Sequence, residues 1–259
     1  MSLASLRPVQ SVLAFLTILP AGKQSHDIHY VARNMYLFPV AGLVIGGLVG
    51  AMAVGISPFL HPLLVGLLVT GMLVIITGVH HTDALADFAD GLMAKGGKEV
   101  KRKAMLDPAL GSAGVAALVM YFAGMIIVFH TGFASGLVIL TGVITAEVIA
   151  KYGMVLLANR GLSAWEGISS PFTAAMKDRR KMAAATGIML AIVWFATSYA
   201  GLIALGISLV ITGLMKYVAG KSFGGISGDV LGASNEMTRL SSLIVLSSLP
   251  TLPLVMTFF

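Results

Sequence analysis

The chain has 259 residues, of which 57% are hydrophobic and 11% are charged, whereas a soluble globular domain carries about 25% charged residues. This composition excludes an ordinary soluble enzyme and predicts an all-α, polytopic membrane helical bundle that forms one integral membrane domain over residues 1–259. The chain has no cysteine, which excludes disulfides, thiolate metal sites and a catalytic thiol. In a membrane protein a net charge of +6 indicates basic loops that set the topology and attract anionic lipid. No nucleic acid partner is therefore expected.

The apolar segments predict about seven transmembrane helices. A first run, residues 9–19, falls short of the roughly 20 residues that a span needs and predicts a short N-terminal interfacial or re-entrant helix. Residues 183–218 are too long for one span, because a helix rises about 1.5 Å per residue across a core of about 30 Å. We therefore divide them near residues 199–201. The predicted spans are 36–56, 60–79, 113–130, 134–157, the two parts of 183–218, and 240–256.

The first predicted span carries glycines at a spacing typical of close helix packing. Gly42, Gly46 and Gly50 are four residues apart, so they lie on one face of a helix. Small residues on one face allow two helix backbones to approach closely within a membrane. We therefore expect this span to pack tightly against another helix.

The basic residues predict the orientation of the chain. All 17 Lys and Arg lie in the N-terminal segment or in alternate loops, whereas the turns near 57–60, 131–133 and 199–201 have none. By the positive-inside rule the basic face is cytoplasmic. This predicts a multi-pass protein of the plasma membrane with active-site loops, about 80–112 and 219–239, on the cytoplasmic face.

An acidic stretch lies between two long apolar runs. Asp83, Asp87, Asp90 and Asp107 fall within 25 residues of a chain that has 11 Asp and Glu in all. The first three fall on one face of a helix, where like charges repel. No Lys or Arg follows until Lys95, so a solvated face of mixed charge is the weaker interpretation. A divalent cation would explain the unmixed sign, and Mg²⁺ takes oxygen ligands beside phosphates.

A glycine-rich segment forms a second polar constellation. Gly224, Gly225 and Gly228 would allow a backbone to approach an anion closely, and Asp229 adds a carboxylate. The segment lacks the spacing of a Walker loop, and an ordinary glycine-rich turn is the alternative. We also count Lys103 and Glu236 as candidate substrate-binding residues.

Two further polar positions remain open. Glu147 lies inside the predicted span 134–157 with Lys151 one turn on. Ionisable residues at membrane depth are usually functional, but a structural pair spaced by four residues explains them equally well. His81, next to the acidic stretch, fits a catalytic base, a partner of a metal ligand, or plain structural polarity.

The motifs resemble two known families. Residues 87–95, DFADGLMAK, resemble the opening of the CDP-alcohol phosphotransferase motif, whose second half is not matched. The stretch 81–91, HTDALADFADG, looks like the HLDGLADTADG signature of cobalamin synthases, or adenosylcobinamide-GDP ribazoletransferases. Residues 105–111, MLDPALG, and 224–233, GGISGDVLGA, are similar to two more of that family's blocks, and 38–42, FPVAG, match its entry to the first span.

The resemblance to cobalamin synthases implies a reaction and its participants. That family joins adenosylcobinamide-GDP to α-ribazole or its 5′-phosphate, releases GMP and uses Mg²⁺. The resemblance also implies that Asp83, Asp87 and Asp90 are metal ligands and that Asp107 is a ligand or a base. The lipid bilayer is the expected surroundings, and a homo-oligomer is left open.

A phospholipid head-group transferase is the alternative enzyme, and a cation transporter is the alternative from another class. A transporter places carboxylates near the membrane midplane, often in two related halves. Here no internal repeat is visible, and most acids lie in loops or at helix ends.

Overall fold

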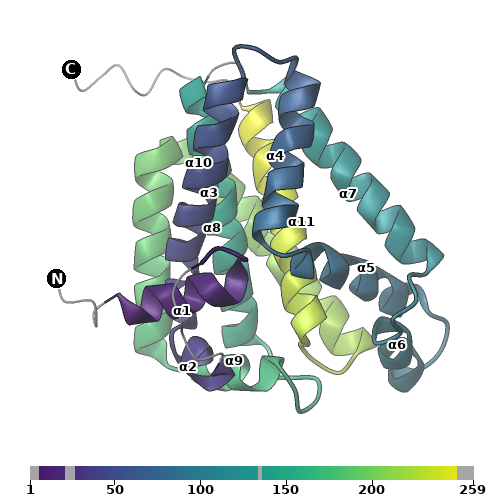
Figure 1. The fold of residues 1–259 in the computed structure, drawn as a ribbon. Helices are drawn as coiled ribbons and strands as arrows, with labels where there is room; N and C mark the ends of the chain where they lie inside the picture. Colours follow the sequence, from purple (N-terminus) through teal and green to yellow (C-terminus); the bar gives the residue numbers. More distant parts are fainter. Residues whose placement is uncertain (1–5, 21–26, 134–135, 250–259) are drawn as a thin grey trace.

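The computed structural model describes residues 6–20, 27–133 and 136–249, and within these it is helical. The only β-structure recorded among them is an isolated parallel bridge between Ser163 and Ile226. The predicted all-α class is thereby confirmed (Figure 1). The elements are α1 (Arg7–Leu16), α2 (Ile28–Arg33), the 3₁₀ turn η2 (Met35–Leu37), α3 (Phe38–Ile56), α4 (Pro62–Ile76), α5 (His80–Met93), α6 (Lys98–Met105), α7 (Ser112–Thr131), α8 (Gly136–Arg160), α9 (Ser169–Ala175), α10 (Arg179–Ser222) and α11 (Gly228–Ser248).

Four helices in the described part of the chain are long and apolar enough to cross a membrane. They are Met35–Ile56, which joins η2 to α3, and helices α7, α8 and α10. The pair α4 and α5 would make a fifth span, but the two helices are bent by 92°. The count of about seven is therefore not confirmed. Of the seventh predicted span, 240–256, residues 250–256 lie outside the described residues.

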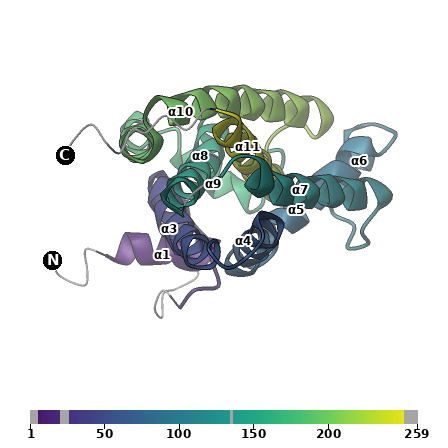
Figure 2. The same ribbon diagram turned by 90° about the horizontal axis from the view of Figure 1, so that it is seen from above.

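The glycine face of α3 packs against α8, as the sequence predicts. A Cβ atom on Gly42 would lie 2.7 Å from the Glu147 carbonyl oxygen, and one on Gly46 would lie 2.7 Å from the Cα of Ile144. Such distances are too short for any side chain, so hydrogen at these positions lets the two helix backbones touch. Figure 2 shows α8 and α11 at the centre, covered on one side by α10.

The connection between α4 and α5 is a tight break. Val79 has a φ of 67° and Gly78 a φ of 66°, and a branched side chain in the left-handed region is strained. The break turns α5 across one end of the bundle (Figure 1). We therefore take α5 to lie outside the membrane-spanning segments.

Helix α10 is also interrupted. Ser198 has non-helical angles inside it, with φ 52° and ψ −134°, directly before the predicted division at residues 199–201. The elements α2, α6 and α9 gather at the end of the bundle that α5 crosses (Figure 1). The segments 80–112 and 219–239, expected as loops, are mostly helical, since α5, α6 and the start of α11 occupy them.

Candidate active site

Helix α5 carries three carboxylates in a row. Asp83, Asp87 and Asp90 span roughly 10 Å of the helix axis at about 1.5 Å per residue. Asp83 is exposed, whereas Asp87 and Asp90 are half-buried. The opposite side of the helix, which includes Leu85 and Phe88, is buried. The sequence thus forms an amphipathic helix whose acidic side is left free for other contacts.

Asp90 binds the start of α7. Its Oδ2 accepts a hydrogen bond from the backbone N–H of Gly111 and its Oδ1 accepts one from that of Gly114, both at 2.8 Å. These N–H groups lie in the first turn of α7, which has no partner for them within the helix. A side chain on Gly114 would collide with the Asp90 carboxylate, since its Cβ would lie 2.5 Å from Oδ2. Asp90 therefore caps α7 and fixes it to α5.

Asp229 faces the same acidic row from the first turn of α11. Ser227 caps this helix, because its Oγ accepts a hydrogen bond of 3.2 Å from the Val230 N–H. The Ser227 hydroxyl also lies 3.4 Å from Oδ2 of Asp229. Burial raises the pKa of the Asp229 carboxyl, and the charge of Asp83 contributes to that rise.

Asp87 experiences the combined charge of its neighbours. Its pKa is raised from the ordinary 3.8 to about 6, chiefly by burial. Repulsion from Asp83, Asp229 and Asp90 contributes to the shift. Acids from two segments far apart in the sequence therefore concentrate negative charge at one place.

This acidic cluster is not a complete metal cage. Among the described residues, no group of three or more His, Asp or Glu side chains is placed to hold a metal ion. Mg²⁺ usually takes only one or two carboxylates from a protein and completes its coordination with water and substrate phosphates. The oxygen donors and the surplus negative charge of Asp83, Asp87 and Asp229 fit that pattern of binding. Asp107 does not line the cavity with Asp83 and Asp229.

Asp107 and Lys103 lie apart from Asp83 and Asp229. Asp107 is exposed and accepts a hydrogen bond of 2.9 Å from the Ala109 N–H. It shares one shallow pocket with Asp90 and another with Lys103 and Arg102. The predicted ligand or base role of Asp107, and the substrate role of Lys103, stay predictions.

The glycine-rich segment is shaped by close packing. Gly224 has a φ of +87°, and a Cβ on Gly225 would lie 2.5 Å from the Leu162 carbonyl oxygen. The neighbouring Ile226 exchanges backbone hydrogen bonds with Leu162 and Ala164, at 2.7 Å and 2.9 Å. This pairing positions the start of α11, and it accounts for Gly224 and Gly225 without a ligand.

Gly228 and Gly232 lie where α11 approaches the cavity. A Cβ on Gly228 would have only Ile168 within 4 Å, so its surface is open. A Cβ on Gly232 would lie 2.5 Å from the Ala84 side chain, so α11 and α5 touch there. This contact brings Asp229 and Asp83 to the same opening.

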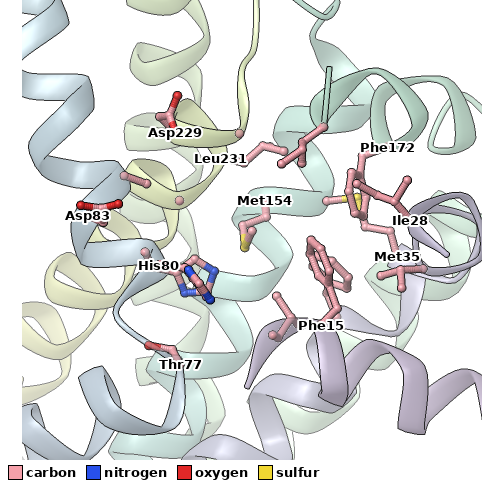
Figure 3. A pocket seen from close by; sticks show the side chains of 18 of the residues that line it. Phe15, Ile28, Met35, Thr77, His80, Asp83, Met154, Phe172, Asp229 and Leu231 are labelled. Carbon is pink, nitrogen blue, oxygen red and sulfur yellow. The ribbon is translucent and has the colours of Figure 1, made fainter. Parts of the chain in front are cut away.

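Asp83 and Asp229 line a cavity of about 550 Å³. In Figure 3 these two carboxylates lie on one side and Phe15 and Phe172 on the other, with Met154 between them. The wall comes from seven helices and the turn η2, several of which are far apart in the sequence. Its residues include Ser11, Phe15, Ile28, Met35, Phe38, Thr77, His80, His81, Asp83, Met154, Phe172, Gly228, Asp229 and Gly232.

Behind the cavity, Arg239 of α11 holds a buried ion-pair network. Its guanidinium is paired with the carboxylates of Glu147 and Glu236, and its Nη1 donates a hydrogen bond of 3.0 Å to the Tyr121 hydroxyl. Arg239 is 1% exposed and both glutamates are 0% exposed. Buried charges need such partners, since leaving one unpaired is strongly destabilising.

The network continues through Lys151 to the cavity. Lys151 donates a hydrogen bond of 2.8 Å to Oδ1 of Asn235 and lies 3.6 Å from the carboxylate of Glu147. Nδ2 of Asn235 donates to Glu236 at 2.8 Å and lies 3.5 Å from Nδ1 of His81. His81, which lines the cavity, is thus oriented by a network of two acids and two bases. Glu236, predicted to bind substrate, is a member of this network and does not line the cavity.

Together the fold and the site define a helical membrane protein with a carboxylate-lined cavity at one end of its bundle. A family model described as Cobalamin-5-phosphate synthase matches residues 8–247. Because the match covers most of the chain, the protein belongs to this family.

Relatives of similar length support the assignment. A protein of Methanosarcina barkeri is 34% identical over 95% of this chain and 93% of its own length. One of Archaeoglobus fulgidus is 33% identical over 92% and 95%, and one of Methanocella arvoryzae is 30% identical over 94% and 96%. All three are named adenosylcobinamide-GDP ribazoletransferase. No solved structure matches the chain.

Proposed function

We propose that this protein is an adenosylcobinamide-GDP ribazoletransferase that carries out the last assembly step of cobalamin synthesis. It joins adenosylcobinamide-GDP to α-ribazole or α-ribazole 5′-phosphate and releases GMP. Family membership over nearly the whole chain supports the reaction. The observation that supports its location is that Asp83 and Asp229 line one cavity and that Asp87 lies close enough to both for their charges to raise its pKa.

The reaction is a phosphoryl transfer. A ribose hydroxyl oxygen of α-ribazole forms a bond to the phosphorus on the cobinamide side of the diphosphate, and the bond from that phosphorus to the GMP oxygen breaks. The hydroxyl proton must pass to a base, and GMP leaves with the electron pair. Such transfers depend on positioning and on neutralising charge rather than on covalent catalysis.

The acidic residues suit this chemistry because their carboxylates can bind a divalent cation. We assign Asp83, Asp87 and Asp229 as the candidate ligands of Mg²⁺, with substrate phosphates completing the site. When bound, the cation would neutralise charge on the diphosphate. Asp90 positions α5 against α7, and the base role predicted for His81, which lines the cavity, stays a prediction.

The surroundings of the site follow from the same proposal. The bilayer surrounds the apolar helices, and the cavity and acidic row face the cytoplasm of a cell whose plasma membrane holds the protein. The concentration of Lys and Arg near this end supports that orientation. The acceptor and the nucleotide substrate then reach the site from the same compartment.

The direct test is GMP release by the full chain reconstituted in liposomes. We expect GMP to appear only when adenosylcobinamide-GDP and α-ribazole are both present, and to stop when a chelator removes divalent cations. Restored turnover on adding Mg²⁺ would support the metal assignment separately from the reaction. Release that does not depend on α-ribazole, or none at all, would contradict the proposed function.

A further inference from the structure

The cavity has two ends of opposite chemistry. We call Asp83 and Asp229 the carboxylate end. The side chains opposite them form the apolar end, which consists of Phe15, Ile28, Met35, Phe38 and Phe172. Figure 3 shows the two ends facing each other, with Met154 between them.

Three aromatic rings build the apolar end. Phe15 lies 5.4 Å from Phe172 and 6.5 Å from Phe38 between ring centroids, and Phe38 lies 6.1 Å from Phe172. Phe38 and Phe172 are buried, which fixes their positions, whereas Phe15 on α1 is 39% exposed. The cluster thus keeps a ring surface that another planar group can contact.

From this arrangement we infer that the apolar end is the binding subsite for the planar base of α-ribazole, with the ribose directed to Asp83 and Asp229. The inference rests on the proposed function and adds where one substrate binds. α-Ribazole is a dimethylbenzimidazole riboside, so it has an apolar planar half and a polar hydroxylated half. Its planar apolar half matches the apolar end of the cavity, and its hydroxylated half matches the carboxylate end.

Size and polarity exclude the other substrate from this space. A cavity of about 550 Å³ is within the range that holds one drug-sized ligand, whereas adenosylcobinamide-GDP carries a corrin ring and two nucleosides. Guanine also carries several hydrogen-bonding groups on its edge. The apolar end has Ser11 nearby but otherwise offers carbon and sulfur, so guanine would lose hydrogen bonds on entering it.

This subsite would determine where the ribose of α-ribazole lies relative to the diphosphate. A base held among Phe15, Phe38 and Phe172 places its sugar toward Asp83 and Asp229, where the diphosphate is expected. The phosphorus and its nucleophile then approach each other from different sides of the carboxylate end. The corrin substrate would bind outside the cavity.

Phe15→Ala tests the subsite with little risk to folding, because this side chain is partly exposed. We expect the KM for α-ribazole to rise roughly 5- to 100-fold, as loss of one base–aromatic stack predicts, while the KM for adenosylcobinamide-GDP stays unchanged. Ala14→Phe, which fills the cavity from the same helix, should also raise only the KM for α-ribazole. The matched control is Phe195→Ala, since Phe195 is 88% exposed on α10.

A binding experiment separates failure of the subsite from failure of the reaction. Equilibrium dialysis of the detergent-solubilised full chain should show saturable binding of α-ribazole that Phe15→Ala weakens and that excess guanosine does not displace. The inference is overturned if GMP release persists with both KM values unchanged in Phe15→Ala and Ala14→Phe. Equal displacement by guanosine, or retention of a membrane lipid that α-ribazole does not displace, overturns it as well. If wild type binds α-ribazole but releases no GMP, the proposed function fails while the subsite stands.

Discussion

Two groups of charged residues in this protein differ in how their charges are compensated. Glu147, Glu236, Lys151 and Arg239 are buried together with equal numbers of each sign, and each has a partner. Such a network fixes how helices meet, although its net contribution to stability can be small. At the carboxylate end the acids have no basic partner among the described ion pairs. The first group holds the helices in place, and the second is available for a substrate or cation.

The shifted carboxyl of Asp87 makes a prediction about pH. Its folded pKa of about 6 lies above the ordinary 3.8, so folding favours the protonated form. The stability that Asp87 contributes is therefore complete below about pH 4 and is lost as pH rises through about pH 6. In chelator, the melting temperature should fall over this range more in wild type than in Asp87→Asn.

The control for this prediction is Glu166→Gln, which removes an exposed acid in a loop. Its melting curve should follow that of wild type at every pH. Parallel curves for wild type and Asp87→Asn would show that the carboxyl is not destabilised by its neighbours. Added Mg²⁺ should then have no effect on the difference between the two proteins.

Individual helices owe their positions to a few close contacts. Helices α3 and α8 meet through Gly42 and Gly46, and α5 meets α11 through Gly232. The second contact brings Asp83 opposite Asp229. Asp90 then sets the position of α7 by capping it. The geometry of the acidic cluster therefore depends on backbone contacts made at its edges.

Adjacent glycines of α3 give a matched test of helix packing. In Gly46→Ala the new Cβ would lie 2.7 Å from the Cα of Ile144, and overpacking of this kind costs about 1–3 kcal/mol in unfolding free energy. Gly47→Ala meets nothing within 4 Å, so it should be neutral or stabilising by up to about 1 kcal/mol. Thermal unfolding in one detergent measures both; equal stability of the two variants would contradict the packing described for α3 and α8.

At the scale of the whole molecule, the chain has two dissimilar ends. The turn between α3 and α4 lies at one end, and α5, α6 and α9 lie at the other (Figure 1). The second end holds the cavity's carboxylates and many of the basic residues. This asymmetry suits the proposed function, in which both substrates would reach the site from the cytoplasm.

The absence of cysteine makes orientation measurable. Lys98→Cys at the start of α6 should react with an impermeant thiol reagent only when the cytoplasmic face is accessible. Phe59→Cys, in the turn between α3 and α4, should react in intact cells. Both variants remove one exposed side chain, so each serves as the control for the other. Labelling of position 98 in intact cells would reverse the assigned orientation.

The sequence predicts those features that depend on local pattern. Long apolar runs locate α3, α7 and α8, the glycine spacing predicts the α3 packing face, and spacing of three and four residues puts the α5 acids on one side. The contact of Asp90 with Gly111 and Gly114 could not be predicted, because no local pattern specifies which distant N–H groups a carboxylate meets. The cavity could not be predicted either, since eight elements must pack together before Phe15 and Asp229 line the same space.

The most direct test of the account is the rate of GMP release after neutralising the carboxylates one at a time. Asp83→Asn, Asp87→Asn and Asp229→Asn keep the side-chain shape but remove the charge. We expect each to lower kcat by about 100-fold or more, the usual effect of losing one group that stabilises transition-state charge. Glu166→Gln, measured in the same liposomes, should keep wild-type turnover. Near-normal GMP release by all three aspartate variants would contradict the assignment of this cavity as the active site.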